Sequence, residues 1–224
     1  MKIVSNGCGH ISFSIDGEDC LKIMADDPVK VTIDHECISI DSQPGFFINA
    51  NNRIVLNGSY NNININGVII QGNRSDNSLC RQVGAHPDPS YKKDWSIPID
   101  PQFSVDRVAL NGSASLYFSD NIFNPDTKFV IAGSGNIEMG CSHSLLKRID
   151  ATISGSGDID FDDASIEELH VSISGSGNIK NFIVTHVCRA NITGSGNVKG
   201  KSAKGASINR NVRGSGQIKI SANT

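Results

Sequence analysis

One short phrase is repeated five times between residues 131 and 218, and it constrains the fold more than any other feature of the chain. Each copy has seven residues. It begins with a β-branched apolar residue and one further residue, continues with a Gly-Ser-Gly triplet and a polar residue, and ends with a second β-branched apolar residue. The copies are Ile131–Ile137, Ile153–Ile159, Ile173–Ile179, Ile192–Val198 and Val212–Ile218. Their first glycines are 19 to 22 residues apart. A nearly constant period of this size indicates a stack of structural repeats.

The apolar positions of the phrase predict strands. They lie six residues apart, an even number, so both can face the same side of an extended chain. Branching at Cβ also suits a strand better than a helix. A single repeat of about 20 residues cannot cover its own apolar face, so repeats must stack with their backbones roughly 4.8 Å apart. We therefore predict an all-β protein with a C-terminal β-solenoid (β-helix-like) of about five 20-residue rungs.

The glycines and the polar residue of each copy predict a tight corner. Glycine reaches positive φ at little cost and lets neighbouring rungs approach closely. Stacked amides at such a corner can hydrogen-bond from rung to rung. Asp158 interrupts the amide series, so we expect an imperfect ladder. The polar column consists of Asn136, Asp158, Asn178, Asn197 and Gln217.

The five copies, together with the preceding segment Val105–Phe118, resemble the GIN-domain family, the head domain of auto-transporter adhesins. The resemblance covers about residues 104–222. It implies a single-stranded β-helix-like fold and an adhesin-like role. It implies neither a catalytic site nor a cofactor.

The rest of the chain is β-rich but lacks the clean repeat. We expect an N-terminal β-rich domain over residues 1–74, a linker over residues 75–103 and the GIN-like domain over residues 104–224. The N-terminal part is either a small antiparallel domain or a set of degenerate rungs beneath the regular ones. Prolines mark the linker. Its Trp95 could anchor it to a domain surface or contribute to a contact with another chain, and we favour the anchoring role.

The densest group of carboxylates consists of Asp158, Asp160, Asp162 and Asp163. Asp158 and Asp160 could share a strand face, either as paired acids of a polysaccharide-cleaving β-helix or as calcium ligands. We favour a solvated corner instead, because the equivalent positions of other repeats hold Asn and Lys. The acidic start of the segment Asp162–His170 would also suit one turn of helix.

Cysteine and histidine occur in four pairs with one residue between the partners. Such partners share a strand face, so the pairs could form two Cys2His2 metal sites. The spacing is tighter than in usual zinc sites, and free cysteine commonly fills β-cores. We therefore predict no metal site and no cofactor, and we expect free thiols in a reducing compartment. The metal candidates are Cys8, His10, His35, Cys37, Cys141, His143, His186 and Cys188.

The charge balance argues against nucleic-acid binding, because the net charge is −3 and the pI is near 6. Basic residues nevertheless gather near the C-terminus and predict a solvated, anion-attracting end of the solenoid. No apolar run approaches 18 residues, so no membrane span is expected. The N-terminus lacks the apolar segment of a signal peptide, which predicts a cytoplasmic or virion-associated protein.

These features favour a non-enzymatic, adhesin-like structural or interaction protein: a rigid solenoid that binds a protein or glycan partner. One form of this hypothesis is a component of a viral or phage particle. Self-association through the solenoid ends is a further expectation, because exposed strand edges are pairing templates. The alternatives are a β-helical carbohydrate-active enzyme that uses acids near Asp158, and a metal-stabilised assembly protein.

Overall fold

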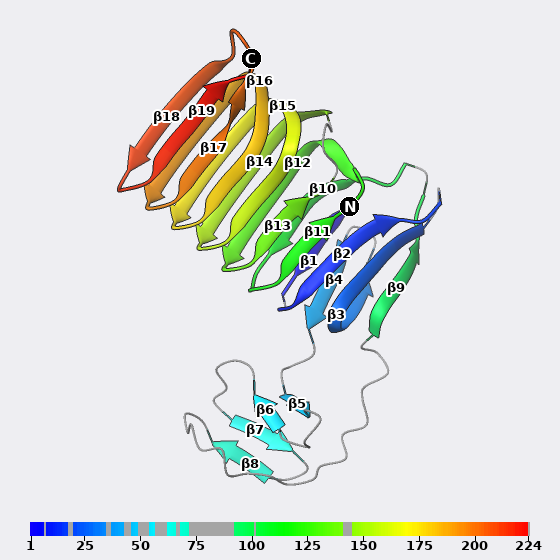
Figure 1. Cartoon of the computed structure of the whole chain (residues 1–224). Helices are drawn as coiled ribbons and strands as arrows, with labels where there is room; N and C mark the ends of the chain where they lie inside the picture. Colours follow the sequence, from blue (N-terminus) through cyan, green and yellow to red (C-terminus); the bar gives the residue numbers. More distant parts are fainter. Residues whose placement is uncertain are drawn as a thin grey trace. The chain divides into compact units, whose positions relative to one another are not determined.

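The computed structural model describes residues 1–6, 8–17, 20–34, 37–42, 46–48, 54–56, 62–65, 68–71, 92–100, 102–140 and 145–223. All regular structure in these ranges is β-strand, and they contain no helix that is long and apolar enough to cross a membrane (Figure 1). The chain divides into two compact units, Met1–Ser42 with Ser90–Thr224 and Gln43–Pro89. The division at residues 74 and 104 that the sequence suggests stays a prediction.

The smaller unit, Gln43–Pro89, contains two antiparallel strand pairs in its described part. One pair consists of β5 (Phe46–Ile48) and β6 (Ile54–Leu56), and the other of β7 (Asn62–Ile65) and β8 (Val68–Gln71). Residues 72–91, which include most of the predicted linker, lie outside the described residues.

The larger unit is built from rungs that each contain a strand, a corner and a second strand (Figure 1). We call the stack of first strands the first ladder and the stack of second strands the second ladder. The first ladder contains β1 (Lys2–Ser5), β10 (Val105–Leu110), β12 (Phe123–Gly133), β14 (Leu145–Gly155), the later parts of β15 (Asp158–Gly175) and β16 (Asn178–Gly194), and β18 (Ser207–Arg213). The second ladder contains β2 (His10–Ile15), β11 (Ser115–Phe118), β13 (Asn136–Met139), the beginnings of β15 and β16, β17 (Asn197–Ser202) and β19 (Gln217–Ala222).

Neighbouring rungs pair in parallel and place equivalent residues of the repeat on one another. Ile153 pairs with Ile131 below it and with Ile173 above it. Ile159 and Ile179 are aligned in the same way on the second ladder. These side chains are at most 1% exposed, so the two ladders enclose one apolar core. The prediction of an all-β protein with a C-terminal solenoid is confirmed, with about six turns from β10 to β19.

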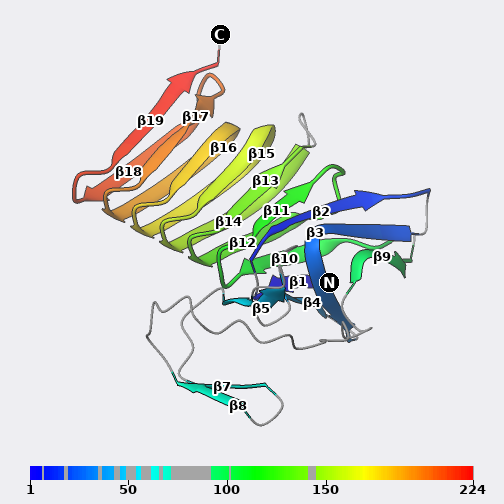
Figure 2. The same cartoon turned by 60° about the horizontal axis from the view of Figure 1, so that its bottom comes forward.

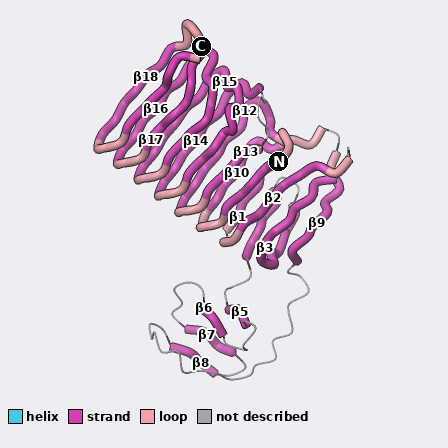
Figure 3. Tube along the Cα trace, in the orientation of Figure 1, coloured by secondary structure: helices cyan, strands magenta, loops and turns pink. Residues whose placement is uncertain are grey.

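The Gly-Ser-Gly triplets form the corners between the ladders, and these corners follow one edge of the stack (Figure 3). Gly155 shows why glycine is needed. Its φ is 145°, and a Cβ added to it would lie 2.1 Å from the carbonyl oxygen of Gly133 in the preceding rung. The predicted close approach and positive φ are both present at this position.

The N-terminal strands belong to the same sheet as the repeats. β1 pairs in parallel with β10, and β2 with β11, so they form a further rung before the regular ones. Beyond this rung, β3 (Cys20–Ile33) runs antiparallel to β2 and then to β4 (Cys37–Ser42), which itself pairs in parallel with β1. The outer strand β9 (Lys92–Pro98) lies antiparallel to β3 (Figures 1 and 2). The N-terminal region therefore combines one degenerate rung with an antiparallel cover.

Aromatic side chains strengthen the N-terminal half of the core. The rings of Phe13 and Phe118 stack with their centroids 4.5 Å apart. Edge-to-face contacts of 5.1 to 5.5 Å continue this row through Phe123, Phe129 and Phe161 and thereby connect the two ladders. Each such pair stabilises a fold by about 0.5–1.5 kcal/mol beyond its burial.

Trp95 attaches β9 to the larger unit. Its indole Nε1 donates a hydrogen bond to the carbonyl oxygen of Val29 at 3.2 Å, and its ring packs against the core. The Nζ atom of Lys92 lies 5.1 Å from the ring centroid. The anchoring role predicted for Trp95 is confirmed.

The predicted turn of helix within Asp162–His170 is wrong, because the segment belongs to β15. Asp162 and Asp163 have φ values of 48° and 57°. These left-handed conformations turn the chain from the second ladder to the first and cannot begin a right-handed helix. Ile166 then faces the core and pairs with β16, so stacking on the next rung determines the structure of this segment.

Candidate binding surface

Charged side chains form a column on the outer face of the first ladder. Consecutive strands β10, β12, β14, β15 and β16 align one member each. In the last four of these strands, the residues on either side of the member are buried and face the core. With strands about 4.8 Å apart, the ends of the column are roughly 19 Å apart. The members are Arg107, Lys128, Asp150, His170 and Arg189.

A shallow depression of about 460 Å³ lies along this column. Beside the charged groups it is lined by Thr152, Ser172 and Asn191, which occupy the next outward column. Hydroxyl, amide, guanidinium and carboxylate groups thus line one depression and offer both donors and acceptors. The five strands that supply them are held in register by the ladder, so the groups are positioned before any ligand arrives.

His170 lies between an acid and a guanidinium at the centre of the column. Its Nδ1 is 3.3 Å from Oδ1 of Asp150, and its Nε2 is 2.8 Å from Nη1 of Arg189. Nη2 of Arg148 also lies 3.2 Å from Nδ1, so each ring nitrogen faces a guanidinium and Asp150 is a second neighbour of Nδ1. This arrangement fixes the ring and directs Nε2 at Arg189 instead of at the hydroxyl of Ser172.

The column contributes little to the stability of the fold. Lys128 and Arg148 approach Asp150 at 3.8 and 3.7 Å, but the three side chains are between 29% and 60% exposed. Surface ion pairs of this kind are worth about 0–1 kcal/mol each. Polar groups that are ordered but contribute so little to stability are available for binding a ligand.

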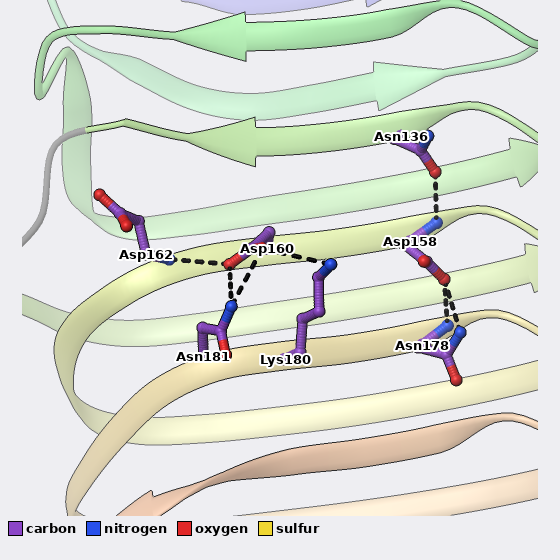
Figure 4. Close-up of polar contacts among 7 residues, drawn as sticks. All are labelled: Asn136, Asp158, Asp160, Asp162, Asn178, Lys180 and Asn181. Carbon is purple, nitrogen blue, oxygen red and sulfur yellow. Dashed lines mark hydrogen bonds and ion pairs between the residues drawn. The ribbon is translucent and has the colours of Figure 1, made fainter.

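The polar column at the corners forms a continuous hydrogen-bonded ladder, of which Figure 4 shows Asn136, Asp158 and Asn178. Asn136 Oδ1 accepts from the backbone N–H of Asp158 at 3.0 Å. Asp158 Oδ1 accepts both the backbone N–H and the side-chain N–H of Asn178 at 2.8 Å. Asn197 continues the series, donating to Asn178 at 2.9 Å and accepting from the backbone N–H of Gln217 at 3.2 Å. The predicted ladder is confirmed, and Asp158 continues it because a carboxylate oxygen accepts as an amide oxygen does.

The other acids of the predicted cluster hold the opposite corner (Figure 4). Asp160 accepts hydrogen bonds from the backbone N–H of Asp162 at 3.1 Å and from the side chain of Asn181 at 3.0 Å. It also lies 3.4 Å from Nζ of Lys180. Asp163 is 3.5 Å from Nζ of Lys201. These contacts agree with the favoured hypothesis of a polar corner and give the carboxylates of Asp160 and Asp163 partners within the fold.

The described members of the Cys/His pairs are spread over the larger unit. Cys8 precedes β2, His10 begins it and stacks on Tyr117, and Cys37 begins β4. The described cysteines are free thiols. Within the described part of the chain, no three His, Cys, Asp or Glu side chains gather as a metal site would require. The remaining candidates, His35, Cys141 and His143, lie outside the described residues.

The pair His186 and Cys188 shows that residues two apart in a strand do not always face the same side. His186 is exposed and contacts Thr185, whereas Cys188 is fully buried. The register between β15 and β16 shifts just before this point, so β16 carries one extra residue. A bulge of this kind interrupts the alternation of strand faces. Burial raises the pKa of the Cys188 thiol to about 11 and keeps it protonated at neutral pH.

The charged column was missed by the sequence analysis, although the sequence carries a signal for it. Each member lies five residues before a corner glycine, the first two before Gly112 and Gly133. The residues at this offset differ in charge and size, so they do not form a visible repeat. Only the register of the rungs shows that they share one line on one face.

The match to known families agrees with the fold. Residues 102–224 match the family described as "Putative auto-transporter adhesin, head GIN domain". The chain belongs to this family. The resemblance predicted from the repeats is thereby confirmed, and the GIN-domain family and the solenoid fold together fit a non-enzymatic, adhesin-like protein. A comparison with curated proteins found no match.

Proposed function

We propose that this GIN-domain protein is an adhesin-like binding protein whose solenoid presents the depression on the first ladder to a glycan partner. The observation that carries the proposal is the depression itself, which collects polar side chains from five consecutive strands in fixed register. A solenoid offers such a surface without a conformational change, because each rung is fixed by its neighbours.

The chemistry of the lining favours a glycan over a protein partner. Sugars present many hydroxyl groups, which Thr152, Ser172 and Asn191 can bind as donors and acceptors. The centre of a protein–protein interface is usually enriched in aromatic and apolar side chains. No Phe, Tyr or Trp side chain lines the depression, and its apolar lining is limited to Val130, Ala151 and Val171. A protein partner is the alternative outcome of the test below.

The other expectations on function stay predictions. These are a role as a viral or phage particle component, a cytoplasmic or virion-associated location, and metal-stabilised assembly through the Cys/His pairs. A carbohydrate-active enzyme that uses acids near Asp158 is not favoured, because both hydrogen bonds to Asp158 Oδ1 belong to the corner ladder. The depression lies on the other ladder, and its lining does not include Asp158.

A glycan array probed with the full chain tests the proposal. Arg189→Gln removes the guanidinium that ends the column and holds His170. Arg213→Gln is the matched control, because Arg213 is exposed on the same ladder but does not line the depression. We expect binding to at least one glycan class, a loss of about tenfold or more in Arg189→Gln, and no loss in the control. Absence of glycan binding, or equal binding by both variants, would overturn the proposal.

A further inference from the structure

The charges of the chain are divided between its two ends. Glu168 is the last acidic residue of the sequence, and the 56 residues after it contain eight lysines and arginines. The first 168 residues contain the other 12 basic residues and all 23 acidic ones. The overall charge of −3 therefore combines a segment of −11 with one of +8. The last rungs of the solenoid form a cationic end on an otherwise acidic protein.

Three lysines of this end form a row across the outer face of the second ladder. Lys180 on β16 is aligned with Lys199 on β17, and Lys199 with Lys219 on β19. Each follows an inward-facing apolar residue, so the three ammonium groups point away from the core at intervals of about 4.8 Å. We call these three residues the lysine row.

The row is only partly neutralised within the described residues. Lys180 lies 3.4 Å from Asp160, whereas Lys199 and Lys219 have no acidic partner in the described ranges. Both are exposed. Like charges on adjacent strands destabilise a sheet, so an anion that bridges them would relieve repulsion as well as form ion pairs.

Hydrogen-bonding groups accompany the lysine row. The corner ladder runs beside it, two residues earlier on each strand, through Asn178, Asn197 and Gln217. Gln217 is its last member, and only its backbone N–H is used in the contacts of the described chain. Its exposed side-chain amide can therefore bind a hydroxyl group of a ligand.

The surface around the row excludes several other partners. The large exposed apolar side chains of the described residues are Met24, Ile33, Leu145 and Val212, and none of them lies on β17 or β19. The row therefore lacks the apolar centre of a protein interface. No Phe, Tyr or Trp follows Phe182, which is buried, so bases of single-stranded nucleic acid would lack the usual stacking platform.

Stacking of a second copy of the chain on the C-terminal edge of the solenoid is also disfavoured. Arg210 occupies the column of Ala151, Val171 and Ala190, which face the core, and donates from Nη2 to the carbonyl oxygen of Ile220 at 3.4 Å. An inward-pointing charge on an edge strand opposes edge-to-edge pairing. The self-association expected from the sequence stays a prediction.

We propose that the lysine row binds an acidic polysaccharide that lies across the strands. Its carboxylate or sulfate groups contact Lys180, Lys199 and Lys219, and the side-chain amide of Gln217 binds a hydroxyl group. This inference goes beyond the proposed function, because it places an anionic class of glycan on the opposite ladder from the depression.

The test measures the affinity of the full chain for heparin, a sulfated polysaccharide, and for polygalacturonate, a carboxylated one. Dextran serves as the neutral control and duplex DNA as the nucleic-acid control. The variant Lys199→Gln/Lys219→Gln removes the two unpaired members of the row. The variant Lys30→Gln/Lys147→Gln removes two exposed lysines elsewhere and changes the net charge equally.

We expect binding to at least one of the two acidic polysaccharides and none to dextran. The row variant should raise the dissociation constant at least tenfold, and the salt dependence of binding should fall by about one unit of slope for each lysine removed. The control variant should change the dissociation constant less than twofold. An equal effect of both variants, no binding to either polysaccharide, or equally tight binding to DNA would overturn the inference.

The two proposals fail separately. Each lysine variant is also applied to the glycan array, where the effect of Arg189→Gln defines binding in the depression. If the array signal persists while polysaccharide binding is absent, the lysine row is wrong and the depression stands. If the row variant alone loses polysaccharide binding while Arg189→Gln leaves the array signal unchanged, the depression is wrong and the lysine row stands.

Discussion

Replacement of Gly175 by alanine should destabilise the solenoid more than any substitution of its exposed neighbours. The φ angle of Gly175 is 139°, which L-residues rarely adopt. Backbone strain of this kind costs about 1–3 kcal/mol. The new Cβ would also lie 2.2 Å from the carbonyl oxygen of Gly155, which is fixed in the preceding rung. Overpacking typically costs about 1–3 kcal/mol, so we expect a total loss of about 4 kcal/mol.

Two control variants separate the parts of this loss. Ser176→Ala changes an exposed side chain in the same corner and should alter the free energy of unfolding by less than about 0.5 kcal/mol. Gly205→Ala introduces the strain alone, because φ is 90° there and no atom lies within 4 Å of the added Cβ. It should therefore cost about 1–3 kcal/mol.

Urea unfolding followed by far-ultraviolet circular dichroism measures these differences. The strand signal is preferable to fluorescence, because Trp95 is the only tryptophan and lies outside the repeats. A loss in Gly175→Ala no greater than in Gly205→Ala would show that the rungs do not approach closely at this corner. A loss no greater than in Ser176→Ala would refute both parts of the reasoning.

Three further predictions concern single side chains. Asp158→Asn should change the free energy of unfolding by less than about 0.5 kcal/mol, because an amide oxygen can also accept the two hydrogen bonds from Asn178. Asp158→Ala removes this acceptor and should lower the free energy of unfolding by about 1–2 kcal/mol. Equal effects of the two variants in urea unfolding would contradict this. Ser5→Ala should raise the free energy of unfolding by about 1 kcal/mol, because the Ser5 hydroxyl is fully buried and has no hydrogen-bond partner among the described residues. A decrease of similar size would contradict this. The pKa of Cys188 is raised by burial from 9.0 to about 11, so the folded chain holds this proton longer than the unfolded chain. The free energy of unfolding should therefore keep its full contribution from the protonated thiol below pH 9 and fall by about 2–3 kcal/mol between pH 9 and pH 11. The free energy of unfolding of Cys188→Ala should fall less over this range. Equal decreases in the two proteins would contradict a raised pKa for Cys188.

The repeats could be predicted from the sequence because stacking demands the same residue at the same place in every rung. Each β-branched residue, corner glycine and amide of a rung packs on the equivalent residue of the next rung, as Ile153 does on Ile173. Local and long-range preferences agree at these positions, so a single sequence reveals them.

The N-terminal rung was harder to recognise because its apolar column is broken. Its sequence reads Gly7-Cys8-Gly9-His10-Ile11, which resembles the repeated phrase. Ser5, however, pairs with Leu110 in the column that holds isoleucine in later rungs. One polar residue at this position hid the periodicity, although the backbone pairing is the same.

The binding surface could not be predicted because outward positions are free to vary. The charged column, for example, contains Lys128, Asp150 and His170, which differ in charge and in hydrogen-bonding groups. Their alignment depends on the register of separate strands. The bulge before Cys188 likewise depends on how β16 pairs with β15. Such features come from tertiary pairing, which residue preferences alone do not determine.

Engineered disulfides test the stacking of the rungs most directly. Ser154, Ser174 and Thr193 are exposed and aligned on three successive strands. Adjacent strands are about 4.8 Å apart, within the range of a disulfide, whereas positions two strands apart are separated by roughly 9.6 Å and cannot be bridged. Mild oxidation followed by peptide mapping should therefore detect a bond in Ser154→Cys/Ser174→Cys and none in Ser154→Cys/Thr193→Cys. A bond in the second variant but not in the first would contradict the stacked register on which the depression and the lysine row depend.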